Sequence, residues 1–160
     1  MPDIIHTAVL SLGSNIEPVA NLKKAVQLLQ SCGQITAVSG VWESEAVGSN
    51  GPNFLNAAVV FKCEYTRFTL KGLVLRPIEE RLGRVRSADK NAPRPMDLDI
   101  TMFDGEVVDQ ELWARLFVAR PLSELLPNLV NPENQHTLLQ TADELHCGGG
   151  AIAHPEIILL

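Results

Sequence analysis

Two aspartates separated by one residue lie within residues 92–103, the stretch whose side chains are best suited to do chemistry. From Met96 onward apolar and polar residues alternate, as in a strand with one buried face. Asp97 and Asp99 should therefore project from the other face, about 7 Å apart. In a partly dry cleft such a pair would raise one pKa or bind a cation, and Mg²⁺ suits one or two carboxylates plus substrate phosphates. A half-exposed strand that happens to carry two aspartates is the alternative interpretation.

Basic residues gather just before these aspartates. Six of the 13 lysines and arginines fall within residues 76–94, where only three acidic residues oppose them. Two prolines flank the last of the six, which favours an extended approach to the aspartates. Such a cluster indicates a site for a small polyanion, and a solvated helix end with scattered charges is the alternative. The six are Arg76, Arg81, Arg84, Arg86, Lys90 and Arg94.

Length and composition favour a single globular domain. The chain has 160 residues, of which 46% are hydrophobic and 20% charged. Its formal charge of −6 argues against a general nucleic-acid binder. No apolar run approaches the ~18 residues of a membrane span, and the N-terminus lacks a signal-peptide layout. We therefore expect a cytoplasmic monomer that makes no membrane contact and keeps its three cysteines reduced.

The hydrophobic pattern predicts an α+β fold, with a largely antiparallel sheet flanked by helices. Strands are expected over residues 6–12, 35–42, 54–62 and 96–103, with a hairpin at 104–105. Helices are expected from an Asn21 cap to Gly33 and over residues 69–82, 123–126 and 137–145. The core should cover residues 4–132, and the glycine-containing tail 147–160 should be flexible.

The third expected strand carries a second candidate site. Phe54 and Asn56 are two positions apart on this strand, so their side chains should point the same way. An aromatic face beside a carboxamide can bind a flat heterocycle by stacking and paired hydrogen bonds. As a bare pair the two residues also fit an ordinary, partly buried strand.

Several motifs together resemble a known family. They occur in a suitable order over residues 7–132, and the Pro-Arg-x-x-Asp-x-Asp segment with its upstream Leu-Gly-Arg-x-Arg is the most specific. The family is that of 6-hydroxymethyl-7,8-dihydropterin pyrophosphokinase. The resemblance implies a ferredoxin-like fold and transfer of a pyrophosphoryl group from ATP to the pterin hydroxymethyl, with release of AMP. The motifs are Gly13-Ser14-Asn15, Phe54-x-Asn56-Ala57-Ala58, residues 78–86, residues 93–100, Arg115-x-Phe117 and residues 126–130.

The resemblance also implies roles for individual residues. Asp97 and Asp99 would hold two Mg²⁺ ions, and Arg84 and Arg94 would lie near the phosphates during turnover. The segments 44–52 and 84–92 would act as lids over both substrates. Other nucleotide contacts would come from Glu79, Arg86, Lys90, Ile100 and Arg115, and pterin contacts from Ser44, Glu45, Val47, Phe54, Asn56 and Phe117.

Three departures from the family pattern stand out. Asn91 and Ala92 occupy the place of a usual loop tryptophan. The connection before Arg115 is short and lacks the usual Pro-His-aromatic segment, although Trp113 is available to pack against a base. Ser44-Glu45 stands where Thr-Pro is usual. These changes leave the metal and arginine chemistry intact, so they favour an active enzyme with weakened or altered binding.

Two other functions remain open on the sequence alone. One is a catalytically weakened paralogue that acts as a pterin- or nucleotide-binding module. The other is a different Mg²⁺-dependent nucleotide transferase on a ferredoxin-like scaffold.

Overall fold

The computed structural model of the chain describes residues 3–46, 50–85, 87–89 and 92–160. In this part of the chain seven strands form one sheet in the order β6-β5-β1-β4-β3-β7, with β2 also paired to β4, and every pairing is antiparallel. The strands are β1 (His6–Ser14), β2 (Gln34–Val38), β3 (Trp42–Ser44), β4 (Phe54–Cys63), β5 (Asp97–Phe103), β6 (Glu106–Val107) and β7 (Ile152–Ala153).

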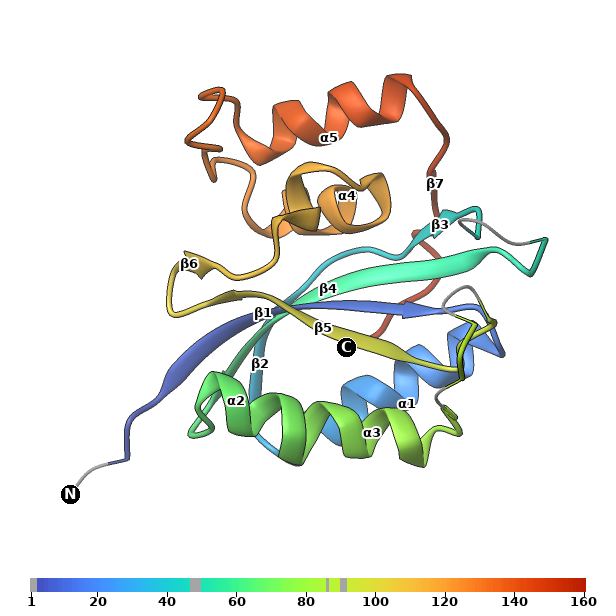
Figure 1. The fold of residues 1–160 in the computed structure, drawn as a ribbon, viewed down its shortest axis with the longest axis vertical. Helices are drawn as coiled ribbons and strands as arrows, with labels where there is room; N and C mark the ends of the chain where they lie inside the picture. The colour runs from blue at the N-terminus through green and yellow to red at the C-terminus, as the bar shows by residue number, and fades with distance from the viewer. Residues whose placement is uncertain (1–2, 47–49, 86, 90–91) are drawn as a thin grey trace.

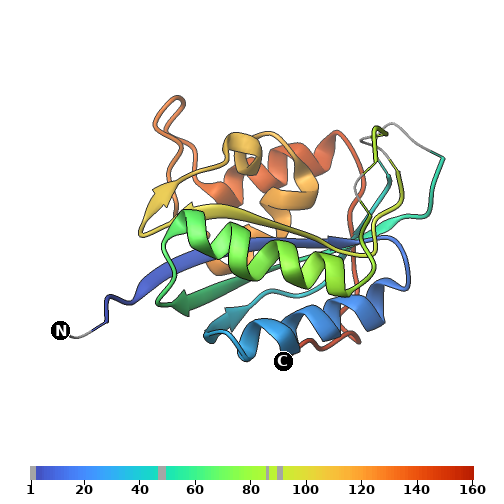
Figure 2. The same ribbon diagram turned by 60° about the horizontal axis from the view of Figure 1, so that its bottom comes forward.

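Helices cover both faces of this sheet. Figures 1 and 2 show α1, α2 and α3 on one face and α4 and α5 on the other. The order β5-β1-β4-β2, with α1 after β1 and the α2–α3 helix after β4, is ferredoxin-like, so the expected fold class is confirmed. The helical segments are α1 (Pro18–Gln30), α2 (Arg67–Leu70), the π-helical η1 (Lys71–Leu75), α3 (Arg76–Arg81), the 3₁₀ turn η2 (Gln110–Trp113), α4 (Leu116–Leu125) and α5 (Leu138–Cys147).

Two buried clusters follow from the alternation of strand side chains. One lies between the sheet and α1, α2 and α3, and the other between the sheet and α4 and α5. Met96, Leu98 and Ile100 enter the first cluster as predicted, but Met102 enters the second. The reason is a register shift, because Leu10 pairs with Ile100 whereas Val9 pairs with Met102. The extra residue, Thr101, is a β-bulge that reverses the facing of the strand after it.

Several element boundaries differ from the prediction. α1 begins at Pro18 instead of after Asn21. Asn21 therefore lies within the helix, and its side-chain amide donates to the Ile16 carbonyl at 2.7 Å. The expected strand 35–42 is divided into β2 and β3, because Gly40 N donates to Glu124 Oε2 of α4 at 2.7 Å. α4 begins at Leu116, seven residues before the predicted start.

Residues beyond 132 contribute to the folded body. Leu138 of α5 is fully buried in the second cluster, and Leu159, next to the last residue, packs in the first. β7 extends the sheet beside β3 (Figure 1). Among the described residues, no helix is both long and apolar enough to cross a membrane.

Gly33 offers a test of how closely the chain packs behind α1. A Cβ there would lie 2.5 Å from the Lys62 carbonyl oxygen and 2.6 Å from the Phe61 ring. Gly33→Ala should therefore lower the unfolding free energy by about 1–3 kcal/mol, because a backbone oxygen cannot move aside cheaply. Urea denaturation followed by circular dichroism measures the change.

Gly72 is the matched control. It lies in the helical segment η1 with nothing within 4 Å of its added Cβ, so Gly72→Ala should leave stability unchanged or raise it by up to about 1 kcal/mol. Equal urea midpoints for Gly33→Ala and the wild type would contradict the packing described around Gly33.

Candidate functional site

A cavity of about 490 Å³ opens on the α4 side of the sheet. Its floor comes from side chains of β1, β4 and β5 that share this face, and Phe117 and Val118 of α4 form one wall. The predicted common facing of Phe54 and Asn56 is confirmed. The cavity brings together eight residues singled out from the sequence: Ser44, Glu45, Phe54, Asn56, Arg94, Asp97, Asp99 and Phe117.

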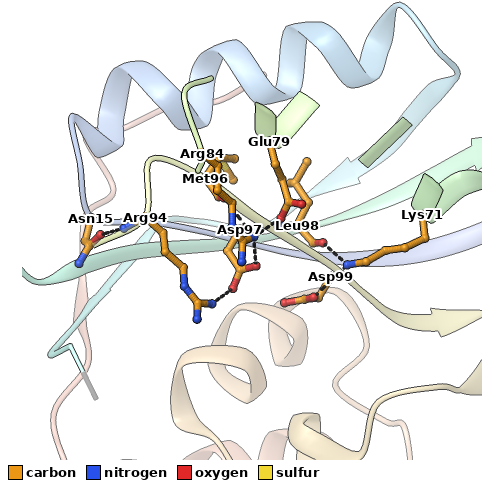
Figure 3. Close-up of polar contacts among 9 residues, drawn as sticks. All are labelled: Asn15, Lys71, Glu79, Arg84, Arg94, Met96, Asp97, Leu98 and Asp99. Carbon is orange, nitrogen blue, oxygen red and sulfur yellow. Dashed lines mark hydrogen bonds and ion pairs between the residues drawn. The ribbon is translucent and has the colours of Figure 1, made fainter. Parts of the chain in front are cut away.

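Two arginines hold Asp97 at one end of this cavity (Figure 3). Arg84 Nη1 donates to Asp97 Oδ1 at 2.9 Å, and Arg94 Nη1 donates to Oδ2 at 3.0 Å. Burial alone would lower the pKa of Arg84, but the charges of Asp97 and Glu79 raise it above its ordinary value. Arg84 is therefore a permanent cation whose position is fixed by two carboxylates.

Glu79 lies beneath this arrangement and joins α3 to β5. Its buried carboxylate pairs with Arg84 Nη1 and accepts from the Leu98 amide at 3.0 Å. Burial raises the pKa of Glu79, while the Leu98 amide and Arg84 oppose the rise. Glu79 is not among the residues that line the cavity. It influences Asp97 through Arg84, which pairs with both carboxylates.

Asp99 faces the same cavity and has a different cation beside it. Lys71 Nζ lies 3.4 Å from Asp99 Oδ1 and donates to the Leu98 carbonyl at 3.1 Å (Figure 3). Burial and the charge of Asp97 raise the pKa of Asp99, and Lys71 offsets part of the rise. Lys71 was missed in the sequence, since only the fold shows that its π-helical segment η1 lies against β5.

The donor set fits Mg²⁺ that shares its shell with a bound phosphate. Asp97 and Asp99 offer carboxylate oxygens on one wall of the cavity. In the part of the chain that the structure describes, no three His, Cys, Asp or Glu side chains are grouped to hold a metal. Mg²⁺ commonly binds to one or two carboxylates together with substrate phosphates and water, so two protein ligands suffice.

The Gly-Ser-Asn motif at the end of β1 fixes the main chain of Arg94. Arg94 N donates to Asn15 Oδ1 at 2.6 Å, and Asn15 N returns a bond to the Arg94 carbonyl at 3.0 Å. Ser14 Oγ donates to the Pro95 carbonyl at 2.6 Å. The motif therefore places an arginine at the cavity, a role that its spacing did not reveal.

The part of the cavity over β4, on the other side of β1 from Asp97, has aromatic and amide character. Asn56 Nδ2 donates to Ser44 Oγ at 2.8 Å and to the Trp42 carbonyl at 3.2 Å, which fixes the orientation of its carboxamide. A Cβ at Gly13 would lie 3.3 Å from Asn56 Oδ1, so glycine keeps this corner open. Phe54 and Phe117 line the same space from β4 and α4.

Other predicted site residues lie elsewhere. Arg115 pairs with Glu111 at 3.3 Å and lines a neighbouring hollow. The side chain of Ile100 is buried in the first cluster, which leaves only its main chain for contact with a nucleotide. Trp113 packs against the second cluster and does not line the described cavity. The predictions for Val47, Arg86, Lys90 and Asn91 fall outside the described residues.

The cavity also contains residues that the sequence did not single out. Ser11 of β1 and Thr101 of β5 belong to its floor, and acidic side chains contribute to its rim. Thr101 Oγ1 donates to the Val9 carbonyl at 2.8 Å at the bulge. Strand parity could have found Ser11, whereas the acidic rim residues Asp109 and Glu111 depend on a loop whose path the sequence does not give.

Comparisons with known proteins agree with this geometry. Residues 9–127 match the sequence model of the family described as 7,8-dihydro-6-hydroxymethylpterin-pyrophosphokinase. The chain is 31% identical over 157 residues to the 2-amino-4-hydroxy-6-hydroxymethyldihydropteridine pyrophosphokinase of Synechocystis, covering 91% of this chain and 80% of the relative. It is 35% identical over 151 residues to the Bacillus subtilis protein of the same name, covering 87% of each.

Solved structures show the same fold. Wild-type HPPK-DHPS of Plasmodium falciparum, determined with STZ-DHP, superimposes with a TM-score of 0.70 at 13% identity. The match covers 91% of this chain and 42% of that one, so this chain spans less than half of the larger protein. At this identity the likeness concerns the fold alone.

Arg84 can be tested as the central cation of the site. Arg84→Met leaves the buried Glu79 carboxylate without its arginine, so it should lower the unfolding free energy by about 3–5 kcal/mol at pH 8. The loss should shrink as the pH falls through the raised pKa of Glu79, because protonation removes the uncompensated charge. Urea denaturation at pH 8 and pH 5.5 measures both effects.

Arg94→Met is the comparison variant. The side chain of Arg94 is more exposed than that of Arg84, so solvent screens its pair with Asp97 and its loss should cost at most about 1 kcal/mol. Equal losses for the two variants, or a loss at Arg84 that does not change with pH, would contradict the assigned role of Glu79.

Proposed function

The chain belongs to the 7,8-dihydro-6-hydroxymethylpterin pyrophosphokinase family, and on this basis we propose that it transfers pyrophosphate from ATP to 6-hydroxymethyl-7,8-dihydropterin in folate biosynthesis. The observation that carries the proposal is one cavity with two chemically different ends. The carboxylates of Asp97 and Asp99 line it from β5 on one side of β1, and the Phe54 ring with the buried Asn56 amide lines it from β4 on the other side. Such a cavity suits a substrate pair of a polyphosphate and a flat heterocycle.

The charged end would hold the triphosphate of ATP. Arg94 lines the cavity and Arg84 lies directly behind Asp97, so both guanidinium groups can exchange a carboxylate contact for a phosphate contact. Mg²⁺ bound there would neutralise phosphate charge and lower the pKa of the pterin hydroxyl. We propose two ions, because Asp97 and Asp99 are separate carboxylates with different neighbouring cations.

The aromatic end would hold the pterin. Phe54 and Phe117 would stack on the ring, and the Asn56 carboxamide, held in place by Ser44 and Trp42, would bind its amide edge. Glu45 lines the same cavity, so its carboxylate can accept from the amino group of the ring. This contact is a departure from the family's usual Thr-Pro and would alter affinity without removing the subsite.

The reaction follows from placing the two substrates end to end. The pterin hydroxymethyl oxygen loses its proton to solvent water and bonds to the β-phosphorus of ATP, and the bond from that phosphorus to the oxygen of the α-phosphate breaks, so AMP leaves. The protein aligns these atoms and neutralises charge with Arg84 and Arg94, which is most of what phosphoryl transfer requires. A single-domain monomer stays a prediction from the sequence. A cytoplasmic location stays a prediction from the sequence.

An AMP-release assay tests the function. Purified protein with ATP, Mg²⁺ and 6-hydroxymethyl-7,8-dihydropterin should release AMP and form the pterin diphosphate in equal amounts, followed by a coupled assay and mass spectrometry. Chelation of Mg²⁺ should abolish the release. Absence of pterin-dependent AMP at high enzyme concentration would contradict the proposal, and pterin binding without product would indicate a binding module instead.

Asp97→Asn and Asp99→Asn are the variants that test the metal ligands. Each should lower kcat by about 100-fold or more, equivalent to several kcal/mol of transition-state stabilisation, while the circular dichroism spectrum stays unchanged. Mn²⁺ binding in the presence of an ATP analogue, measured by electron paramagnetic resonance, should fall from two ions toward one. Near-normal turnover in either variant would show that the carboxylate does not bind the metal.

A further inference from the structure

The last ten residues, 151–160, make ordered contacts with the sheet although they lie outside the stretch that matches the family model, residues 9–127. β7 pairs with β3, and His154 N donates to the Val41 carbonyl at 2.8 Å. Leu159 then enters the first buried cluster. The tail is therefore attached to the fold at both a strand and a core position.

β3, the strand to which the tail pairs, also orients the amide of the proposed pterin subsite. β3 has only three residues, Trp42, Glu43 and Ser44, and its other edge pairs with the start of β4. Its Trp42 carbonyl and Ser44 Oγ both accept from Asn56 Nδ2. A three-residue strand has little stability of its own, so support from both edges matters for the position of Asn56.

A chain of polar side chains strengthens this support. His154 Nε2 lies 2.9 Å from Glu43 Oε1, and His154 Nδ1 lies 2.7 Å from Glu156 Oε1. The other oxygen of Glu43 accepts from Asn53 Nδ2 at 2.8 Å. Glu43 directly precedes Ser44 and Asn53 directly precedes Phe54, so Glu43 connects the two chain segments that enter the subsite.

We propose that His154 and Glu43 are positioning residues of the pterin subsite, through which the C-terminal tail holds β3 and the start of β4 in binding geometry. This inference rests on the proposed function, because it concerns affinity for the same pterin. Neither side chain needs to touch the substrate. Their effect reaches it through Ser44, Asn56 and Phe54.

Charge makes the contact dependent on pH. Glu43 from β3 and Glu156 from the turn after β7 are the charged groups described against His154, and both accept from its ring. These hydrogen bonds raise the pKa of His154, and the bonds of Glu43 to Asn53 and His154 lower the pKa of Glu43. The ion pair is therefore complete below the raised histidine pKa and is lost as the pH rises through it.

Binding measurements on the full chain separate this role from a general structural one. Isothermal titration calorimetry should give the Kd of 6-hydroxymethyl-7,8-dihydropterin with a non-hydrolysable ATP analogue present, and the Kd of the analogue alone. His154→Ala and Glu43→Gln should each weaken pterin binding about 3–10-fold at pH 6, the range of one hydrogen bond of ordinary net strength. Affinity for the analogue alone should not change.

The double variant and pH provide further readouts. His154→Ala combined with Glu43→Gln should bind pterin no more weakly than the more affected single variant, because both changes break the same contact. Wild-type affinity should fall as the pH rises from 6 to 8.5, and His154→Ala should show a smaller fall. His6→Ala is the matched control, since it breaks a His–carboxylate contact of 2.6 Å to Asp104 at the hairpin after β5, outside the cavity.

Each outcome decides between the two proposals. If the wild type does not bind the pterin, the proposed function fails. If the wild type binds it and both single variants bind equally well, the positioning role is overturned while the function stands. A loss of pterin affinity shared with His6→Ala, or an equal loss for the ATP analogue, would also overturn the positioning role, because it would reflect general destabilisation.

Discussion

The placement of Arg84 between Glu79 and Asp97 is the interaction on which the site depends. Glu79 is buried below the sheet and cannot remain charged there without a cation, and Arg84 is that cation. The same guanidinium reaches Asp97, so the need to neutralise a buried carboxylate also fixes an arginine directly behind a cavity residue. The positive charge that a phosphate needs is therefore already in place next to Asp97 before any phosphate arrives.

The two ends of the cavity are supported by different parts of the fold. The helix α3 and the turn after β1 hold the charged end through Glu79 and Asn15. The aromatic end depends on β3, a short strand held by β4 on one edge and by the tail on the other. Residues far apart in sequence thus meet on one face of the sheet, where α4 closes over them (Figures 1 and 3).

The sequence predicted the features that follow from local periodicity and missed those that depend on contacts between residues far apart in the chain. Strand alternation was enough to place Asp97 and Asp99 on one face of their strand and Phe54 and Asn56 on one face of theirs. Only the structure shows that both pairs line the same cavity. It could not show the bulge at Thr101, because the bulge is set by how β5 pairs with β1. Lys71, the acidic rim of the cavity and the role of the tail also depend on long-range packing. The buried pair of Glu79 and Arg84 leaves no periodic signal, so the sequence indicated Glu79 only through the family resemblance.

On the proposed function, Asp97 gives up its arginine contacts to bind a metal ion when nucleotide binds, and the released guanidinium binds a phosphate. A crystal structure with Mn²⁺ and a non-hydrolysable ATP analogue, with anomalous scattering to locate the metal, tests it most directly. The account predicts Mn²⁺ at Asp97 and Asp99, with Arg94 on a phosphate oxygen. Nucleotide bound elsewhere, or Asp97 still held by both arginines with no Mn²⁺ beside it, would contradict the account.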